Sequence, residues 1–341
     1  MAGLDGKAIL ITGAARGIGA ATARELDRRG ARLLLLDLDP EPIERLAAEL
    51  RHAVALPADV TDAVALAHAV TTGIERLGGL DCAIANAGIG PVGSVEELAP
   101  ELFERTIDVN LLGAYRTLRL SLPHVRARGG YLLAVASLAA PVHSPLMAHY
   151  AASKAGVEAF ADALRTEVAH EGVAVGVAYF GWIATEMVRA GMEDPGAAAM
   201  RRGSLPGPMR RDLPPEGAAR AVAGGIERRA RVVAYPWWVR PILAARGLIQ
   251  PLTELQLRRS GMAAEAVRAS ARLRPGPGGD NVGRAMRVID CECGATLQAA
   301  NDDDLAGQVR EHLDADHPDM EMTDDELRGF VSGKAYAASD S

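Results

Sequence analysis

Seven short apolar runs recur between Lys7 and Tyr235, and helix-length stretches separate them. Each run is rich in Leu, Val, Ile or Ala and is too continuously apolar for a strand with one wet face, so each is typical of a buried parallel strand. The alternation predicts an α/β fold, a doubly wound parallel sheet with helices on both faces. The runs are Lys7–Thr12, Ala31–Asp37, Ala53–Asp59, Leu80–Asn86, Gly130–Ser137, Val173–Phe180 and Arg231–Tyr235.

Charge is distributed unevenly along the 341 residues. The formal net charge is −7, yet the segment 281–341 holds 14 acidic and 5 basic side chains, so the excess of acids lies at this end of the chain. Hydrophobic residues make up 49% and charged residues 24%, which excludes a disordered chain. The acidic end predicts a separate small domain and argues against a nucleic-acid surface there, because phosphates would be repelled.

Domain boundaries follow from composition. We expect a dinucleotide-binding domain at 1–240, an amphipathic helical extension at 241–273, a Pro- and Gly-rich linker at 274–285 and a small α+β domain at 286–341. Residues 186–215 lack a strand signal, and an insertion of that length is either a mobile lid or disorder. In the small domain we expect a strand at 286–289 and a helix at 302–316, with Asn301 as its N-cap.

The cysteines, the first residues and the longest apolar stretches indicate in which cellular compartment the protein is expected. The three cysteines are Cys82, Cys291 and Cys293, which is too few and too closely spaced for a disulfide framework. The first residues carry no signal-peptide pattern, and no stretch approaches 18 consecutive apolar residues. The expected location is the cytoplasm.

A glycine-rich turn, TGAARGIG at residues 12–19, follows the first apolar run and opens a helical stretch. Gly13, Gly17 and Gly19 let the backbone approach a pyrophosphate, and the helix N-terminus at Ile18 offers free N–H groups to it. Asp37 ends the next run, eighteen residues after Gly19, where its carboxylate accepts hydrogen bonds from ribose hydroxyls and repels a 2′-phosphate. Arg16 inside the turn favours a 2′-phosphate instead. We favour NAD over NADP.

The spacing of further motifs resembles the short-chain dehydrogenase/reductase family over about residues 1–240, which implies a Rossmann fold. Asp59-Val60 resembles that family's contact to adenine, and Asn86-Ala87-Gly88 resembles its segment after the fourth strand. The resemblance implies that Thr185 binds the nicotinamide carboxamide and that the enzyme is a homodimer or homotetramer. Its catalytic tetrad corresponds to Asn110 in DVNLLG, Ser137 in VASLAA, and Tyr150 with Lys154 in YAASK.

The chemistry of the tetrad can also be argued from its residue types. Tyr150 and Lys154 are four residues apart and share a helix face. A lysine ammonium and a positive nicotinamide both favour the phenolate, so we expect Tyr150 to act as general acid and base for an alcohol while hydride is exchanged with the nicotinamide. Ser137 ends a strand and is placed to hydrogen-bond the substrate oxygen. In the family pattern, Asn110 holds a water that relays protons from the lysine.

The substrate pocket is expected between Ser137, Tyr150 and the insertion at 186–215. The neighbouring side chains are mostly apolar, which favours a hydrophobic secondary alcohol or ketone over a sugar phosphate. They are Leu138, His143, Met147, Phe180, Trp182, Met187 and Met192. Phe180 stands where the family usually has proline, so we expect a looser turn after this strand.

The segment after Tyr235 contains Trp237, Trp238 and a leucine-rich amphipathic stretch beside arginines. A subunit interface, a cover for the substrate pocket and a shallow membrane anchor are three interpretations of it. We favour packing within the protein or its oligomer over membrane contact.

The acidic segment 281–341 contains a Cys-x-Cys pair, Cys291 and Cys293, ahead of a His-x4-His pair, His312 and His317. Two thiolates and two imidazoles have the ligand count of a zinc site, although one residue between the cysteines is tighter than usual. The alternative is a small structural domain without metal. The segment also resembles a small Cys/His-containing family of no established activity.

Three functions therefore remain open. The first is an NAD-dependent oxidoreductase acting on a hydrophobic alcohol or ketone, and the second is an NADP-dependent ketone reductase that uses Arg16. The third is a non-enzymatic dinucleotide-binding interaction protein. The complete tetrad favours an enzyme, because a binding protein has no need of all four side chains.

Overall fold

A computed structural model describes residues 3–204, 207–271, 287–290, 296–299, 302–317, 322–323, 326–327, 329–331 and 336–337. The chain divides into two compact units, Met1–Ser270 and Ala271–Ser341. The larger unit holds the predicted parallel sheet, and each unit has its own apolar core.

Seven parallel strands form one sheet in the order β3-β2-β1-β4-β5-β6-β7, so the predicted α/β fold is confirmed. The winding changes direction between β1 and β4, and in such sheets a crevice opens at the carboxyl ends of the strands on either side of that point. The strands are β1 (Ala8–Thr12), β2 (Arg32–Asp37), β3 (Ala53–Pro57), β4 (Cys82–Ala85), β5 (Tyr131–Val135), β6 (Ala174–Phe180) and β7 (Val232–Tyr235).

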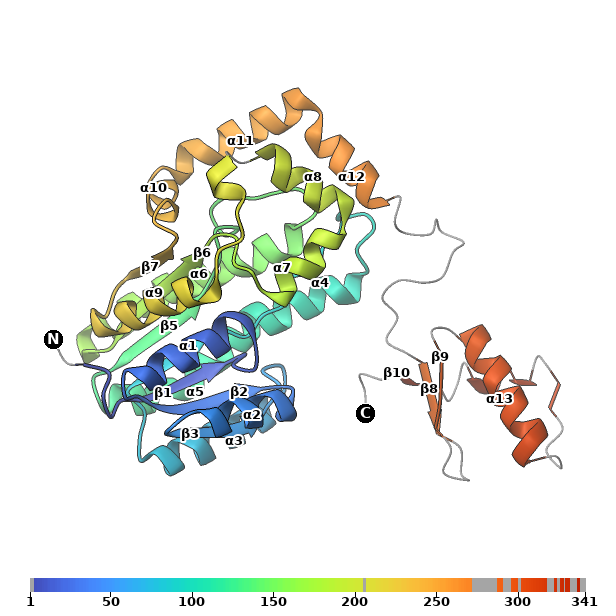
Figure 1. Ribbon diagram of the computed structural model, residues 1–341, viewed down its shortest axis with the longest axis horizontal. Coiled ribbons are helices and arrows are strands. Elements are labelled where there is room, and N and C mark those ends of the chain that lie inside the picture. Colours follow the sequence, from blue (N-terminus) through green and yellow to red (C-terminus); the bar gives the residue numbers. More distant parts are fainter. Residues whose placement is uncertain are drawn as a thin grey trace. The chain divides into compact units, whose positions relative to one another are not determined.

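Helices cover both faces of the sheet (Figure 1). Successive side chains of a strand point to opposite faces. Leu33 and Leu35 of β2 therefore pack with one set of helices, and Leu34 and Leu36 pack with the other. The first set is α1 (Gly17–Arg28), α2 (Pro40–Glu49) and α9 (Pro215–Glu227); the second is α3 (Ala63–Leu77), α5 (Gly113–Arg126) and α6 (Ala148–Val168).

On the second face, α4 (Pro100–Ile107) runs into α5 through a single π-helical turn, η1 (Asp108–Leu112). Such turns are rare and often occur at functional sites. This one carries Asn110.

The insertion after β6 is helical. Its described residues form α7 (Glu186–Glu193), α8 (Pro195–Ser204) and a 3₁₀ turn at Gly207–Arg210. A bridge between Ile183 and Leu213 joins its two ends. The described part of the segment is therefore helical, and its mobility as a lid stays a prediction. We call the segment 186–215 the lid.

The extension consists of three helices, α10 (Val239–Ala244), α11 (Arg246–Ser260) and α12 (Met262–Ala271), which pass over the lid in Figure 1. Leu257 and Ala266 are buried with Met200 of α8 in a small apolar cluster. The backbone of α12 lies so close to Gly196 that any Cβ there would overlap the carbonyl oxygen of Ala266. The extension therefore packs directly onto the lid.

The smaller unit contains an antiparallel sheet in the order β10-β8-β9 and a helix that packs beside it. The strands are β8 (Arg287–Asp290), β9 (Thr296–Ala299) and β10 (Tyr336–Ala337), and the helix is α13 (Asp302–Asp316). Leu305, Val309 and Leu313 of α13 lie in the unit's core at helical spacing. The expected strand and helix occur here, while Asn301 lies outside the described residues.

Candidate active site

Tyr150 and Lys154 lie one turn apart on α6, and Ser137 lies two residues beyond β5. Tyr150 and Ser137 share a side-chain hydrogen bond. The Lys154 Nζ donates to the backbone oxygen of Val135 at 3.0 Å and lies 5.8 Å from the centre of the Tyr150 ring. The end of β5 thus holds both the hydroxyl partner of the tyrosine and the acceptor of the lysine.

The environment of these two groups differs from the expected one. Burial raises the pKa of Tyr150 above its ordinary value, and the hydrogen bond with Ser137 opposes that rise. Burial also lowers the pKa of Lys154 to about 8. Both shifts have the same origin, because a low-dielectric environment disfavours the charged form of either group. The protein alone therefore does not supply the acidic tyrosine that we expected from the adjacent ammonium.

Asn110 is buried and clamps the chain segment that follows β4. Its Oδ1 accepts a hydrogen bond from the Ile89 N–H at 2.8 Å, and its Nδ2 donates to the Ile89 oxygen at 2.9 Å and to Ser153 Oγ at 3.0 Å. A Cβ on Gly88 would lie 3.1 Å from the Asn110 Oδ1 and 3.3 Å from the Lys154 Nζ. Gly88, Asn110 and Lys154 therefore meet. The water relay inferred for Asn110 stays a prediction.

The glycine turn passes close to the segment after β4. Gly13 has φ of +65°, and a Cβ on it would lie 2.7 Å from the Cα of Ala87. Asn86 holds the turn in place, because its Nδ2 donates to the backbone oxygens of Thr12 and Gly13. No side chain caps the start of α1, so the first N–H groups of Gly17 and its successors are free to bind phosphate. This cradle fits a dinucleotide.

Thr12 is a positioning residue that the sequence reasoning missed. Its buried Oγ1 accepts hydrogen bonds from the N–H groups of Asn86 and Ala87, at 3.1 and 3.3 Å. It therefore ties the end of β1 to the segment after β4. The sequence did contain a signal for this role, because Thr12 is a polar residue that ends an apolar run directly before Gly13.

The residues expected at the adenosine end lie at the ends of β2 and β3. The Asp37 Oδ2 accepts a hydrogen bond from the Ala15 N–H at 2.8 Å, so this carboxylate borders the turn. Asp59 accepts from the Thr61 N–H, and Val60 is buried. The Ala58 N–H donates to the Asp37 backbone oxygen, so the ends of β2 and β3 that carry the predicted adenosine residues lie side by side.

Arg16 is already paired with acids on two sides. Its guanidinium donates to Asp39 at 3.3 Å and to Glu186, at the start of the lid, at 3.0 Å. All three side chains are substantially exposed, so the pairs contribute little to stability. The two carboxylates offset the positive charge of Arg16, which we had expected to favour binding of a 2′-phosphate.

Thr185 joins the glycine turn to the lid. Its Oγ1 accepts a hydrogen bond from the Val188 N–H and caps α7, while a Cβ on Gly17 would lie 3.1 Å from its methyl group. The turn before it is held despite the missing proline, since the Gly181 N–H donates to the Tyr235 oxygen and the Leu138 N–H to the Phe180 oxygen. The Phe180 side chain is buried in the core on the α1 and α9 side, so it does not line a substrate pocket there.

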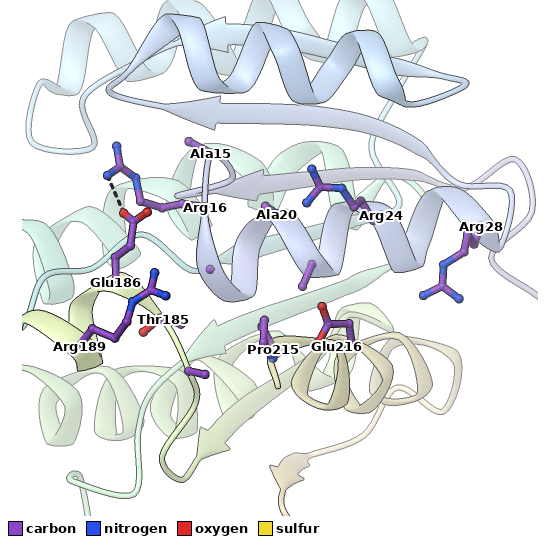
Figure 2. A pocket seen from close by; sticks show the side chains of 13 residues that line it. Ala15, Arg16, Ala20, Arg24, Arg28, Thr185, Glu186, Arg189, Pro215 and Glu216 are labelled. Carbon is purple, nitrogen blue, oxygen red and sulfur yellow. Dashed lines mark hydrogen bonds and ion pairs between the residues drawn. The ribbon is translucent and has the colours of Figure 1, made fainter. Parts of the chain in front are cut away.

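A cavity of about 380 Å³ lies beside the glycine turn, between α1 and the first residues of α7 and α9 (Figure 2). Arginines dominate its wall: Arg16, Arg24, Arg28 and Arg189. Arg24 and Arg28 are paired with Glu49 and Glu25. The cavity adjoins the glycine turn. None of the four tetrad residues lines it, so the cavity is distinct from the expected reaction centre.

The candidate zinc ligands can be followed only in part. The rings of His312 and His317 lie 5.2 Å apart in an edge-to-face arrangement. Cys291 and Cys293 lie outside the described residues. Among the residues that the structure describes, no group of three His, Cys, Asp or Glu side chains forms a metal site. The zinc site stays a prediction.

The short chain dehydrogenase family matches residues 7–196, and the chain belongs to this family of dehydrogenases and reductases. It is 36% identical over 223 residues to a mouse protein named L-fucose dehydrogenase, covering 64% of this chain and 81% of that protein. It is 38% identical over 210 residues to the 2,3-dihydro-2,3-dihydroxybenzoate dehydrogenase of Bacillus subtilis, covering 60% and 80%. The protein is accordingly an NAD(P)-dependent oxidoreductase.

Solved structures give the same fold. A 3-ketoacyl-(acyl-carrier-protein) reductase from Brucella melitensis, complexed with NADH, is 30% identical with a TM-score of 0.62 and covers 68% of this chain and 97% of its own. An alcohol dehydrogenase from Thermococcus sibiricus, complexed with 5-hydroxy-NADP, is 29% identical with a TM-score of 0.58 and covers 67% and 94%. Both kinds of dinucleotide thus occur among the neighbours.

The close packing inside the turn gives a direct test of the cradle. A Cβ at residue 19 would overlap the carbonyl oxygen of Gly13, so Gly19→Ala must open the turn. We expect dinucleotide affinity to fall by about tenfold to a hundredfold, which corresponds to roughly 1–3 kcal/mol of overpacking. Quenching of tryptophan fluorescence measures it. Gly247→Ala is the matched control, because a Cβ there meets nothing within 4 Å. Unchanged affinity in Gly19→Ala would contradict the cradle.

Proposed function

We propose that the protein is an NAD-dependent dehydrogenase or reductase that exchanges hydride with a hydrophobic secondary alcohol or ketone. The observation that carries the proposal is the meeting of Tyr150, Ser137 and Lys154 at the carboxyl end of β5, beside a glycine cradle. When bound, the nicotinamide of the dinucleotide supplies the hydride acceptor or donor. The pyrophosphate of the dinucleotide would be bound by Gly13, Gly17, Ile18 and Gly19, and the carboxamide of the nicotinamide by Thr185.

Each of the four tetrad side chains has a separate role in proton transfer or in positioning. As the phenolate, Tyr150 takes the proton of the alcohol during oxidation, and as the neutral phenol it donates a proton to the substrate oxygen during reduction. Ser137, through its bond with that hydroxyl, fixes the point at which the substrate oxygen is held. Lys154 carries a pKa of about 8, so it exchanges protons near neutral pH. Asn110 keeps the segment at Gly88 and Ile89 in place beside the lysine.

The lid and the extension support an apolar substrate. A Cβ on Gly90 would lie 3.2 Å from the Met187 sulfur and 3.4 Å from the Tyr150 ring, so the first turn of the lid reaches the tyrosine. Farther along, Leu146 is buried with Met200 of the lid and Leu257 of the extension. Apolar walls of this kind favour a hydrophobic alcohol or ketone. A screen of alcohols and ketones, followed by NADH absorbance, tests the substrate class; turnover confined to sugars would overturn it.

The charges at the adenosine end support NAD. Asp37 borders the turn, and Arg16 is engaged by Asp39 and Glu186. A 2′-phosphate would meet the Asp37 carboxylate, and a close like-charge contact costs at least about 1 kcal/mol even in water. We therefore expect NAD to bind at least about fivefold more tightly than NADP in fluorescence titrations. Asp37→Ser should narrow that ratio, and Asp62→Ser, at the start of α3, is the control. A preference for NADP in the unaltered protein would support the reductase alternative.

An assembly surface is available on α4 and α5. Phe103, Leu112 and Tyr115 are large side chains that remain 39–42% exposed there, and Tyr115 packs edge-to-face on Phe160 of α6. We propose that this face pairs two copies into a homodimer, or four into a homotetramer, of a cytoplasmic enzyme. In the part of the chain that the structure describes, no helix is long and apolar enough to cross a membrane.

A further inference from the structure

Helix α11 is apolar on two opposite faces. Its inner face meets the rest of the unit, since the His143 N–H donates to the Gln250 Oε1 at 2.8 Å and Leu257 is 6% exposed. Leu248, Leu252 and Leu255 follow one another at spacings of four and three residues, so they form a stripe on the opposite side of the helix. We call these three residues the outer stripe.

The outer stripe is uncovered. Leu248 is 72%, Leu252 64% and Leu255 43% exposed. Trp237, just before α10, is 78% exposed, whereas its neighbour Trp238 is buried. The sequence favoured internal or subunit packing for this segment, and within the single chain that packing covers only the inner face. The extension thus covers the lid with one face and leaves a second apolar face unpartnered.

The charge around the stripe is positive. Helices α10–α12 contain five arginines and two glutamates, and one of these arginines, Arg246, is paired with Glu158 of α6. Arg258 and Arg259 end α11 next to the stripe, and Glu254, the one acid of this helix, hydrogen-bonds Gln250 on the inner side. A symmetric pair of such helices would bring arginines together without acids to match them. An apolar stripe with a basic border instead complements a lipid membrane, in which negatively charged headgroups lie above apolar acyl chains.

We propose that the outer stripe and Trp237 dock the enzyme onto anionic lipid membranes, with the leucines at the level of the acyl chains and the arginines among the phosphates. The helix lies along such a surface and does not cross it. The net charge of −7 repels an anionic surface as a whole, so attachment has to come from this basic and apolar face. The proposal does not depend on which alcohol the enzyme oxidises.

Co-sedimentation of the full chain with lipid vesicles tests this docking. We expect binding to vesicles that contain phosphatidylglycerol, weakening as salt is added, and little binding to pure phosphatidylcholine. Leu248→Ser with Leu252→Ser should lower the partition coefficient by about tenfold or more, because two leucines no longer enter the apolar layer. Arg258→Gln with Arg259→Gln should remove most of the salt dependence.

Matched controls separate the lipid surface from other partners. Val64 of α3 is 81% exposed, so Val64→Ser removes an exposed apolar group elsewhere and should leave binding unchanged. Dinucleotide binding should persist in every variant, since none of the replaced side chains belongs to the residues expected to hold the dinucleotide. Equal sedimentation of the leucine variant and the unaltered protein overturns the proposal. So does a loss of oligomeric mass in the leucine variant by light scattering, because the stripe would then cover a second copy of the chain.

Discussion

Replacing Tyr150 by phenylalanine should lower the turnover number by roughly a thousandfold and leave dinucleotide affinity within about twofold of the unaltered enzyme. The ring still packs beside Gly90 and the Met187 sulfur, so the site keeps its shape. What is lost is the hydroxyl that bonds Ser137 and that we propose transfers the proton. The measurements are initial rates with a substrate from the alcohol and ketone screen, and a fluorescence titration with NAD.

Tyr115→Phe is the control for this prediction, because Tyr115 lies on the exposed side of α5 and makes its contact through the ring. Its turnover should stay close to that of the unaltered protein. Substantial turnover in Tyr150→Phe would mean that another group transfers the proton. If affinity fell together with turnover, Tyr150 would instead be a determinant of binding.

Replacing Lys154 by methionine abolishes turnover and stabilises the fold at pH 7. Burial lowers the pKa of this lysine from 10.5 to about 8, so the folded protein holds the charged form at a cost of about 3 kcal/mol, at roughly 1.4 kcal/mol for each pH unit. Methionine removes that cost and gives up the bond from the charged ammonium to the Val135 oxygen, worth about 2 kcal/mol. We expect the free energy of unfolding in urea to rise by about 1 kcal/mol at pH 7, the difference between these two contributions.

The gain in stability depends on pH in a defined direction. Between pH 8 and 10.5 the unfolded chain keeps the Lys154 proton and the folded protein has lost it, so the unaltered protein gains stability as pH rises. The advantage of Lys154→Met should therefore shrink across that window and stay constant below pH 8. Comparing the two proteins at each pH removes the contribution of Cys82, whose pKa burial raises. Lys7→Met, which breaks a partly buried pair with Asp81, should show no gain. If the difference in the free energy of unfolding between Lys154→Met and the unaltered protein did not change with pH, the lowered pKa of Lys154 would not be the cause of the added stability.

The alternation of apolar runs predicted the parallel sheet, because strands buried on both faces need continuous apolar sequence. Likewise, the glycine turn and Asp37 were recognisable because each sits where a strand of such a sheet must end. The segment 186–215 was recognisable as an insertion, but its helices were not. Its prolines and glycines gave no helical signal, whereas α8 is held by contacts with residues far along the sequence, such as Met200 with Leu257.

Side-chain electrostatics also escaped the sequence. Tyr150 and Lys154 share a helix face, which suggested that the ammonium would dominate, but burial of both groups decides the direction of their pKa shifts. Arg16 was interpreted as a free cation, and its partner Glu186 lies 170 residues away. Neither effect has a local signature.

The sequence by itself determined the class of fold, the order of the catalytic and cofactor-binding residues along the chain, and the charge imbalance of the segment 281–341, since these depend on residue type and local spacing. Only the tertiary structure decided which face of each element is covered. Helix α11 illustrates the reason. A helix with apolar residues on both sides has no preferred inward face, and the contacts of Gln250 and Leu257 with distant segments turned Leu248 and Leu252 outward.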